Sequence, residues 1–395
     1  MVRARHNLLL CVAIAVASMT GCGDQESPAP TVDISKLDSG NYQSVPKERV
    51  ELREPKYGAP LEAVRIGAAT PLIVEADDRF LFQRFVNAER RLLPDSLPDL
   101  FSLKADEFTD LAPGFVTGWA TNAERRTPAF VGREVTLQIL RFTDANTADT
   151  AGRRLAERQA QNLPGETVAI TGYPQAHAKW SPSKKYLDVW LTRESLLLYV
   201  HMDDPVSEPP ESAPLIEIVR KVLDNQVEGL KNYIPTALDE FGSLPIDVDG
   251  VLSRTLPLED NEKGKGYDPS TVLPARAALH YEMDPAATRA AFNDAGVDLV
   301  TLSGADVYRA RDSAGAARLM AAMIDHRSSG WQAMDGPPGL PTAKCFDTKD
   351  KKLNASRYAP ACFVQYDRFV ARITGGNPQK MHQKTAAQYK LLAFE

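Results

Sequence analysis

One order of helix and strand patterns occurs twice along this 395-residue chain. Each time, a helix is followed by two strands, a second helix, three strands and a long final helix. The two copies also share a short motif, because Leu72–Asp77 and Leu279–Asp284 both read Leu-x-x-Glu-x-Asp. Since exact identities are otherwise few, the order of elements, more than any sequence period, indicates a diverged duplication. The alternative is a pair of unrelated α+β domains.

Several strand segments alternate between apolar and polar residues, a pattern typical of half-buried strands in antiparallel sheets. In the first copy, Lys185–Thr192 alternates, and Leu196–Met202 returns after a short turn as the second arm of a hairpin. In the second copy, Cys362–Tyr366 and Phe369–Thr374 form a similar hairpin. We therefore predict an α+β fold of two similar domains, each a largely antiparallel sheet with helices packed on one face.

Capping residues and apolar spacing predict the helices. Asp144 precedes a helix predicted over residues 145–160, and Asn377 precedes the last helix of the chain. Apolar residues recur at helical spacing over residues 81–93 and 213–233, so both stretches are predicted to be helical.

The N-terminus is basic and then apolar. Arg3 and Arg5 precede the apolar run Leu8–Met19, which is shorter than the roughly 20 residues that a bilayer-spanning helix needs. A basic start, a short apolar core and small residues at its end are typical of a secretory signal peptide. We predict that residues 1–21 are removed and that the mature chain begins at Cys22.

The sequence Met19-Thr20-Gly21-Cys22 resembles the bacterial lipoprotein signal, whose pattern is an apolar residue, two small residues and a cysteine. In that family the cysteine receives a diacylglyceryl group and becomes the first residue. The resemblance implies lipidation at Cys22 and an exported protein held on the outer face of the cytoplasmic membrane. Two acyl chains suffice, since each buried CH₂ contributes about 0.8 kcal/mol and a single chain holds only marginally. The alternative is a secreted protein without lipid.

Two cysteines remain for the folded body. Of the four in the chain, Cys11 would leave with the signal peptide and Cys22 would carry lipid, which leaves Cys345 and Cys362. Thiols outside the cytoplasm tend to pair, so we predict a disulfide between them. Closing this loop would contribute roughly 3 kcal/mol in the chain-entropy account. The alternative is two free buried thiols.

Composition divides the chain into segments. Residues 22–58, rich in proline, serine and charge, are predicted to be a flexible tether between lipid and body. The N-terminal domain is predicted over residues 59–235, a proline- and glycine-rich linker over 236–274, and the C-terminal domain over 275–395. The net charge of −6 argues against a nucleic acid partner, because such partners bind clustered basic surface.

No motif indicates a metal, a cofactor or a catalytic centre. The six histidines form no His-Glu-x-x-His sequence or other close pair. Asp247–Gly250 looks like the start of a calcium loop, but Leu258 stands where that loop needs its glutamate. The strained Gly-x-Ser-x-Gly turn of a hydrolase nucleophile is also missing. We therefore predict no cofactor, no metal site and no catalytic residue.

Tyr186, Asp188 and Trp190 share one face of a predicted strand. Aromatic side chains with a polar tip suit binding surfaces, so these three residues are a candidate ligand-binding set. The alternative is an ordinary sheet face that is half-exposed or covered by the next element.

The lipidation motif, the two-unit order and the Cys345…Cys362 hairpin together resemble a family of actinobacterial cell-envelope lipoproteins of unknown function. Each half also resembles the PsbP-type α+β domains, whose body often serves binding. The resemblance implies a non-enzymatic binding or scaffolding role, with membrane contact through the anchor and an envelope protein or lipid as partner. The alternatives are a carrier of an apolar or glycolipid ligand, and an envelope hydrolase. The oligomeric state stays open.

Overall fold

A computed structural model gives the structure of the protein, and it describes residues 32–47, 57–83, 89–95, 103–126, 131–259, 270–350, 359–375 and 377–394. The predicted signal peptide and Cys22 lie outside the described residues. Within the described part of the chain, no helix is both long enough and apolar enough to cross a membrane.

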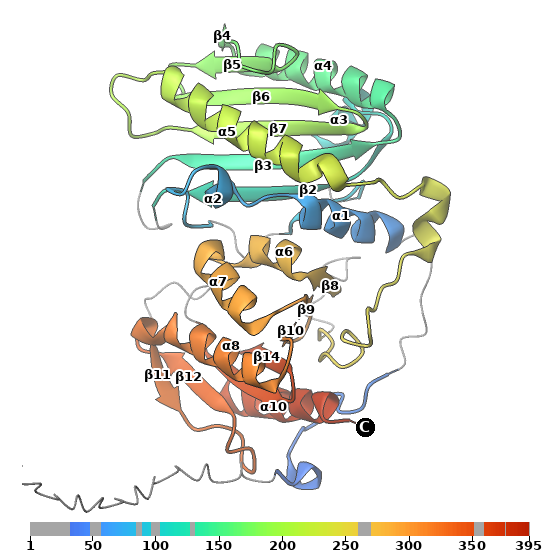
Figure 1. Ribbon diagram of the computed structural model, residues 1–395, viewed down its shortest axis with the longest axis vertical. Coiled ribbons are helices and arrows are strands. Elements are labelled where there is room, and N and C mark those ends of the chain that lie inside the picture. The colour runs from blue at the N-terminus through green and yellow to red at the C-terminus, as the bar shows by residue number, and fades with distance from the viewer. Residues whose placement is uncertain are drawn as a thin grey trace, which may run out of the picture. The chain divides into compact units, whose positions relative to one another are not determined.

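Two seven-stranded antiparallel sheets form the body (Figure 1). The strands of the first sheet are β1 (Arg91–Leu92), β2 (Phe115–Glu124), β3 (Glu134–Phe142), β4 (Glu166–Thr167), β5 (His177–Ser181), β6 (Tyr186–Arg193) and β7 (Leu196–Asp203). Those of the second are β8 (Thr271–Pro274), β9 (Leu299–Leu302), β10 (Asp306–Arg309), β11 (Trp331–Met334), β12 (Lys344–Thr348), β13 (Ala361–Tyr366) and β14 (Phe369–Thr374).

Helices flank both sheets. Those of the N-terminal half are α1 (Gly58–Ala69), α2 (Ile73–Ala76), α3 (Ala105–Leu111), α4 (Ala145–Asn162) and α5 (Ala213–Gly229). Those of the C-terminal half are α6 (Ala275–Ala278), α7 (Pro285–Ala295), α8 (Ser313–Asp325) and α10 (Pro378–Leu392). Short 3₁₀ turns are η1 (Ile34–Lys36), η3 (Leu230–Asn232), η4 (Leu238–Ser243), η5 (Leu279–Tyr281) and η6 (Ser328–Gly330).

Both sheets have the same strand order. The first runs β1-β2-β3-β7-β6-β5-β4, and the second, read from β8, runs β8-β9-β10-β14-β13-β12-β11. In each half a helix follows the third strand and another follows the seventh, namely α4 and α5 in the first half and α8 and α10 in the second. The predicted α+β fold of two similar domains with antiparallel sheets is confirmed.

The helices cover both faces of each sheet, whereas the sequence predicted one. In the first sheet, Leu187 and Val189 of β6 share a core with α5, and Trp190 of the same strand shares a core with α4 on the opposite face. In the second sheet, Phe363 and Val364 of β13 divide in the same way between the α8 side and the α10 side. Both faces are covered because successive side chains of these strands point to opposite faces and both sets are apolar.

The helix predicted over residues 81–93 is wrong where the structure describes it. Phe82 forms a β-bridge with Glu124, and Arg91 and Leu92 form β1, paired with the edge of β2. Residues 84–88 lie outside the described part. Pairing with the neighbouring strand overrides the helical spacing of the apolar residues, as tertiary context commonly does.

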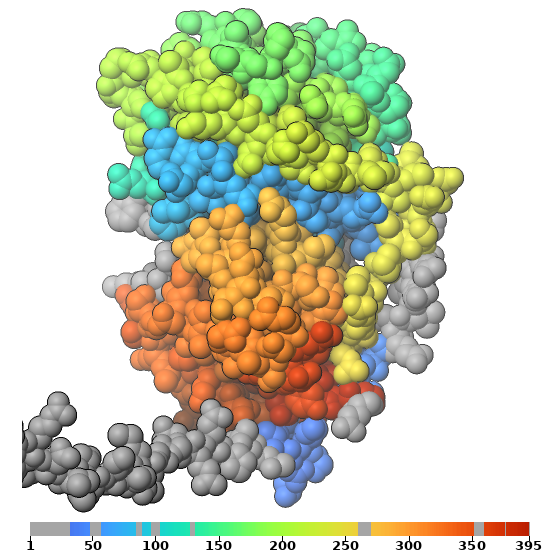
Figure 2. Space-filling view, viewed as in Figure 1, coloured from blue at the N-terminus to red at the C-terminus, as the bar shows by residue number. Residues whose placement is uncertain are grey.

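Residues 32–47, which the sequence places in a flexible tether, lie against the C-terminal half (Figure 2). Leu37 is only 3% exposed and belongs to the core cluster that α10 contributes to. Asp38 accepts a hydrogen bond from Gln383 of α10 at 3.0 Å. The stretch predicted as a linker also carries structure, since β8 lies within it and forms an edge of the second sheet.

The two halves meet through the repeated Leu-x-x-Glu-x-Asp segments. Glu75 of the first accepts a hydrogen bond from Arg276 of α6 at 2.8 Å. His280 of the second is fully buried, with its ring nitrogens 2.9 Å from Thr121 Oγ1 and 3.1 Å from the carbonyl oxygen of Thr70. These contacts join the halves through one buried, hydrogen-bonded histidine and one ion pair that is partly exposed.

Cys345 and Cys362 form the predicted disulfide. They face one another on the neighbouring strands β12 and β13, with their Cα atoms 4.1 Å apart. The pair joins the two strands at the centre of the α10-side core, where both side chains are buried.

Candidate functional site

The candidate site lies between α7 and α8, whose ends are set by local sequence. The side chain of Asp284 accepts a hydrogen bond from the backbone N–H of Ala287 and so caps the start of α7, where Pro285 suits the first turn. Gly296 ends α7 with a φ of +65°, a conformation that favours glycine. Asp312 caps α8 in the same way as Asp284 caps α7.

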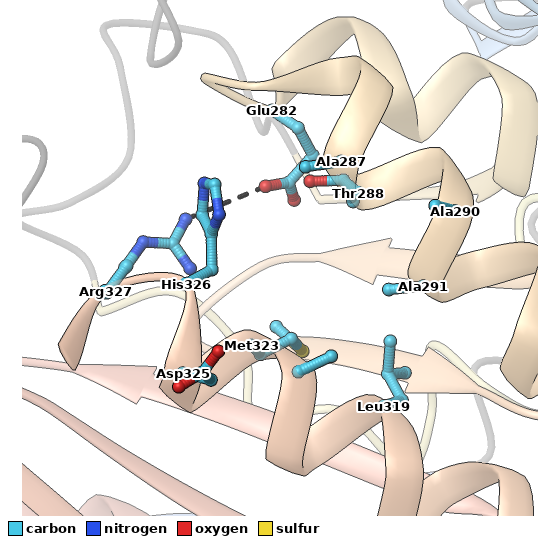
Figure 3. A pocket seen from close by; sticks show the side chains of 11 residues that line it. Glu282, Ala287, Thr288, Ala290, Ala291, Leu319, Met323, Asp325, His326 and Arg327 are labelled. Carbon is cyan, nitrogen blue, oxygen red and sulfur yellow. Dashed lines mark ion pairs between the residues drawn. The ribbon is translucent and has the colours of Figure 1, made fainter.

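The two helices approach closely where α7 ends and α8 begins. A Cβ atom on Gly315 of α8 would lie 2.5 Å from the carbonyl oxygen of Ala295, so glycine allows this close approach. At the other end the helices leave a cavity of about 320 Å³ (Figure 3). Its lining residues are Glu282, Ala287, Thr288, Ala290, Ala291, Leu319, Ala322, Met323, Asp325, His326 and Arg327. We call this cavity the α7–α8 groove.

Most of the α7–α8 groove is apolar. Leu319 and Met323 of α8 are 1% and 8% exposed and form its buried wall. Alanines from both helices complete the lining, and their small side chains leave the space between the helices open. The groove therefore offers an apolar surface that no side chain of the described residues fills.

One end of the groove is polar and charged. Glu282 is 7% exposed, and one of its carboxylate oxygens accepts a hydrogen bond from the Tyr308 hydroxyl at 3.3 Å. Its other oxygen lies 3.7 Å from the guanidinium of Arg327, which also stands 6.0 Å from the centre of the Trp331 ring. Burial lowers the pKa of Arg327, the charge of Arg372 lowers it further, and Glu282 opposes both.

A second ion pair lies near this charged end. Arg372 donates hydrogen bonds to one carboxylate oxygen of Asp306 at 2.9 and 2.7 Å. Burial raises the pKa of Asp306, against the lowering effect of Arg372. Together with Glu282 and Arg327, this pair gives two carboxylates and two guanidinium groups.

The residues proposed from the sequence as a ligand surface lie elsewhere, in the first sheet. Tyr186, Asp188 and Trp190 do share one face of β6, but Asp188 and Trp190 are each only 2% exposed. Trp190 donates a hydrogen bond to Gln159 of α4 at 2.6 Å and stacks on Tyr199, with the ring centres 4.3 Å apart. Two of the three side chains therefore bind partners within the protein.

Asp188 is the centre of a polar cluster on that face. It accepts hydrogen bonds from the Tyr199 hydroxyl and from Nδ1–H of His201, both at 2.7 Å. Burial lowers the pKa of His201, but its interactions with Asp188 and Asp203 outweigh burial and raise that pKa to about 10. The cluster holds a protonated histidine against the sheet.

Sequence reasoning missed the α7–α8 groove. The periodicity of Leu319 and Met323 marks the inner face of a helix, and it does not show that the facing helix presents mostly alanines. Arg327 and Glu282 are far apart in sequence and match no motif. Among the described residues, no group of histidine, cysteine, aspartate or glutamate side chains could hold a metal ion.

Two family matches cover most of the chain. Residues 51–246 match the family described as "Domain of unknown function (DUF7373) N-terminal", and residues 251–395 match its C-terminal counterpart. The chain belongs to the DUF7373 family. The two-domain organisation of the DUF7373 family thus agrees with the two sheets. No curated protein matches the chain.

One solved structure similar to a part of this DUF7373 chain is the extracellular domain of PknH from Mycobacterium tuberculosis. The similarity covers 35% of this chain and 77% of that chain, with 14% sequence identity and a TM-score of 0.21.

Proposed function

We propose that this protein is a lipid-anchored binding protein on the outer face of the cytoplasmic membrane in an actinobacterial cell envelope. The signal Met19-Thr20-Gly21-Cys22 supports the anchor. The disulfide between Cys345 and Cys362 supports export, because such bonds persist in oxidising compartments. The role is non-enzymatic, and the α7–α8 groove is the binding site.

The observation that carries the binding role is the chemistry of the groove. Ligand sites are mostly apolar cavities with a few placed polar groups, and their volumes range from about 300 to 1,000 Å³. The groove has a volume of about 320 Å³, an apolar wall and a charged end at Glu282 and Arg327. Its size suits the apolar portion of one small ligand, so the protein would act as a carrier or receptor of an apolar or glycolipid molecule.

Native mass spectrometry tests the binding role. The Cys22→Ala protein should leave the membrane fraction, and its folded form should carry a co-purified ligand. Filling the groove with Ala322→Phe should remove that ligand, because the new ring occupies the space between the helices. Ala321→Phe is the matched control, since Ala321 is an exposed neighbour on α8 that does not line the groove.

This site would be ruled out if the Cys22→Ala protein had a ligand-free mass, and if neither Ala322→Phe nor Ala321→Phe changed the amount of bound ligand. If crosslinking in membranes then captured an envelope protein on the anchored protein that keeps Cys22, a scaffolding role would replace the carrier role. A Cys22→Ala protein that was still processed and still sedimented with membranes would show that lipid on Cys22 is not the anchor.

A further inference from the structure

The charged end of the α7–α8 groove contains a donor and an acceptor that do not satisfy one another. The free carboxylate oxygen of Glu282 and the guanidinium of Arg327 are 3.7 Å apart, which is too long for a hydrogen bond. No hydrogen bond links the Arg327 guanidinium to any of the described residues, and Glu282 accepts only one, from Tyr308. Glu282 is 7% exposed, and its second oxygen is not fully shielded from solvent, so this oxygen is available to a partner inside the groove.

A hydroxyl group fits this arrangement. It donates one hydrogen bond and accepts others, so it can donate to Glu282 and accept from Arg327 at the same time. A carboxylate or phosphate could accept from Arg327 but would face the negative charge of Glu282. An ammonium could bind Glu282 but would face the positive charge of Arg327. The geometry of the pair therefore favours a neutral group with both functions.

The charges around the groove disfavour an anionic head, because three carboxylates lie there with two guanidinium groups. Glu282 and Asp325 are the acidic lining residues, and Arg327 is the basic one. The nearby ion pair of Asp306 and Arg372 adds one charge of each sign. No excess of positive charge is present to attract an anion, and like charges close to a bound ion oppose its binding.

We propose that the α7–α8 groove binds a single-chain amphiphile with a neutral, hydroxyl-bearing head, such as a monoacylglycerol. The acyl chain lies between α7 and α8 against Leu319 and Met323, and a head hydroxyl bridges Glu282 and Arg327. This assignment rests on the proposed binding function and names the class of ligand.

Isothermal titration calorimetry of the Cys22→Ala protein with three ten-carbon probes tests the assignment. The probes are 1-decanoylglycerol, decanoate and decyltrimethylammonium, each used below its critical micelle concentration. They carry similar chains and differ mainly in their heads. We expect decanoylglycerol to bind at least about tenfold more tightly than either ion, since one hydrogen bond to a charged group is worth about that factor or more.

Single substitutions test the role of each charge. Arg327→Gln should weaken decanoylglycerol binding about tenfold and shift the preference toward decyltrimethylammonium, since Glu282 then acts alone. Glu282→Gln should shift it toward decanoate. Arg318→Gln is the matched control and should change none of the affinities, because Arg318 lies on α8 outside the groove and pairs with Asp294. If Glu282→Gln does not fold, the Arg327→Gln variant still tests the assignment, because Arg327 is only half-buried.

The possible outcomes separate the two proposals. If the three probes bind equally, and Ala322→Phe abolishes all three, the groove binds chains but the inference about the head is overturned. Tighter binding of decanoate or of the ammonium probe also overturns it. If no probe binds and Ala322→Phe changes nothing, the proposed function itself fails.

Discussion

His280 is buried between the two halves of the body as a neutral side chain. Burial lowers its pKa, and the charge of Arg90 lowers it further, to about 3. The ring packs edge-on against Trp119 and is hydrogen-bonded on both nitrogens, to Thr121 and Thr70. Because His280 stays unprotonated in the folded protein, the unfolded chain binds one more proton than the folded protein at mildly acidic pH.

His280 should therefore contribute a fall of about 2 kcal/mol in the free energy of unfolding between pH 7 and pH 5, since an unfolded histidine titrates near 6.5 and each pKa unit is worth 1.36 kcal/mol. Urea denaturation at the two pH values measures the loss. His280→Gln should abolish most of it while keeping a hydrogen-bonding side chain. His201 acts in the opposite direction, because its raised pKa gives stability that is fully present well below pH 6.5 and is lost as pH rises toward 10. It therefore offsets part of the fall in both proteins, and the difference between the original protein and His280→Gln isolates the effect of His280.

An unchanged pH dependence in His280→Gln would show that other groups cause the loss. Asp77 is not expected to contribute in this range, because hydrogen bonds from Arg79 outweigh its burial and lower its pKa to about 2. Its stabilising effect is present above the ordinary pKa of an aspartate and is lost only below pH 4.

At the residue scale, the sequence predicted the partners of a side chain only where a covalent bond or regular spacing along one strand determines them. Cys345 and Cys362 could be matched because few cysteines remained. The shared face of Tyr186, Asp188 and Trp190 followed from strand periodicity, but the contact of Trp190 with α4 did not. The pairing of Glu282 with Arg327 depends on how α7 and α8 pack, and no single-residue pattern encodes that distance.

At the element scale, the sequence predicted the inner strands and the long helices and missed every edge of the two sheets. β1, β4, β8 and β11 occupy the four edges, and each has only two to four residues. Such short strands show too little alternation to recognise. By contrast, α4, α8 and α10 begin after Asp144, Asp312 and Asn377, each of which caps its helix as a side-chain acceptor.

The disulfide between β12 and β13 should stabilise the C-terminal sheet. Replacing both cysteines, as Cys345→Ala with Cys362→Ala, should lower the free energy of unfolding by about 2–4 kcal/mol, because the unfolded chain loses a cross-link. Chemical denaturation of the oxidised protein and of the double variant measures the difference. A reducing agent should destabilise the original protein and leave the double variant unchanged; equal sensitivity of the two would contradict the assignment.

At the scale of the whole molecule, the segment of residues 32–47 belongs to the C-terminal half of the body. Residues 32–47 bring Leu37 into the α10-side core, and Tyr42 lies beside Lys384, whose ammonium is 2.9 Å from Glu259. The residues between Cys22 and Val32 span at most about 36 Å even when fully extended. If Cys22 carries lipid, the docked segment limits how far the C-terminal half can move from the membrane.

Leu37→Ala should therefore release this segment and lower the free energy of unfolding by about 2 kcal/mol, the lower end of the range for a buried leucine. Denaturation measures the energy, and limited proteolysis should show faster cleavage within residues 32–47. Leu238→Ala is the matched control, because Leu238 is 48% exposed and its loss should change stability by less than about 0.5 kcal/mol. If Leu37→Ala and Leu238→Ala have the same free energy of unfolding, and if residues 32–47 are cleaved as fast in the original protein as in Leu37→Ala, then Leu37 does not hold this segment against the C-terminal half.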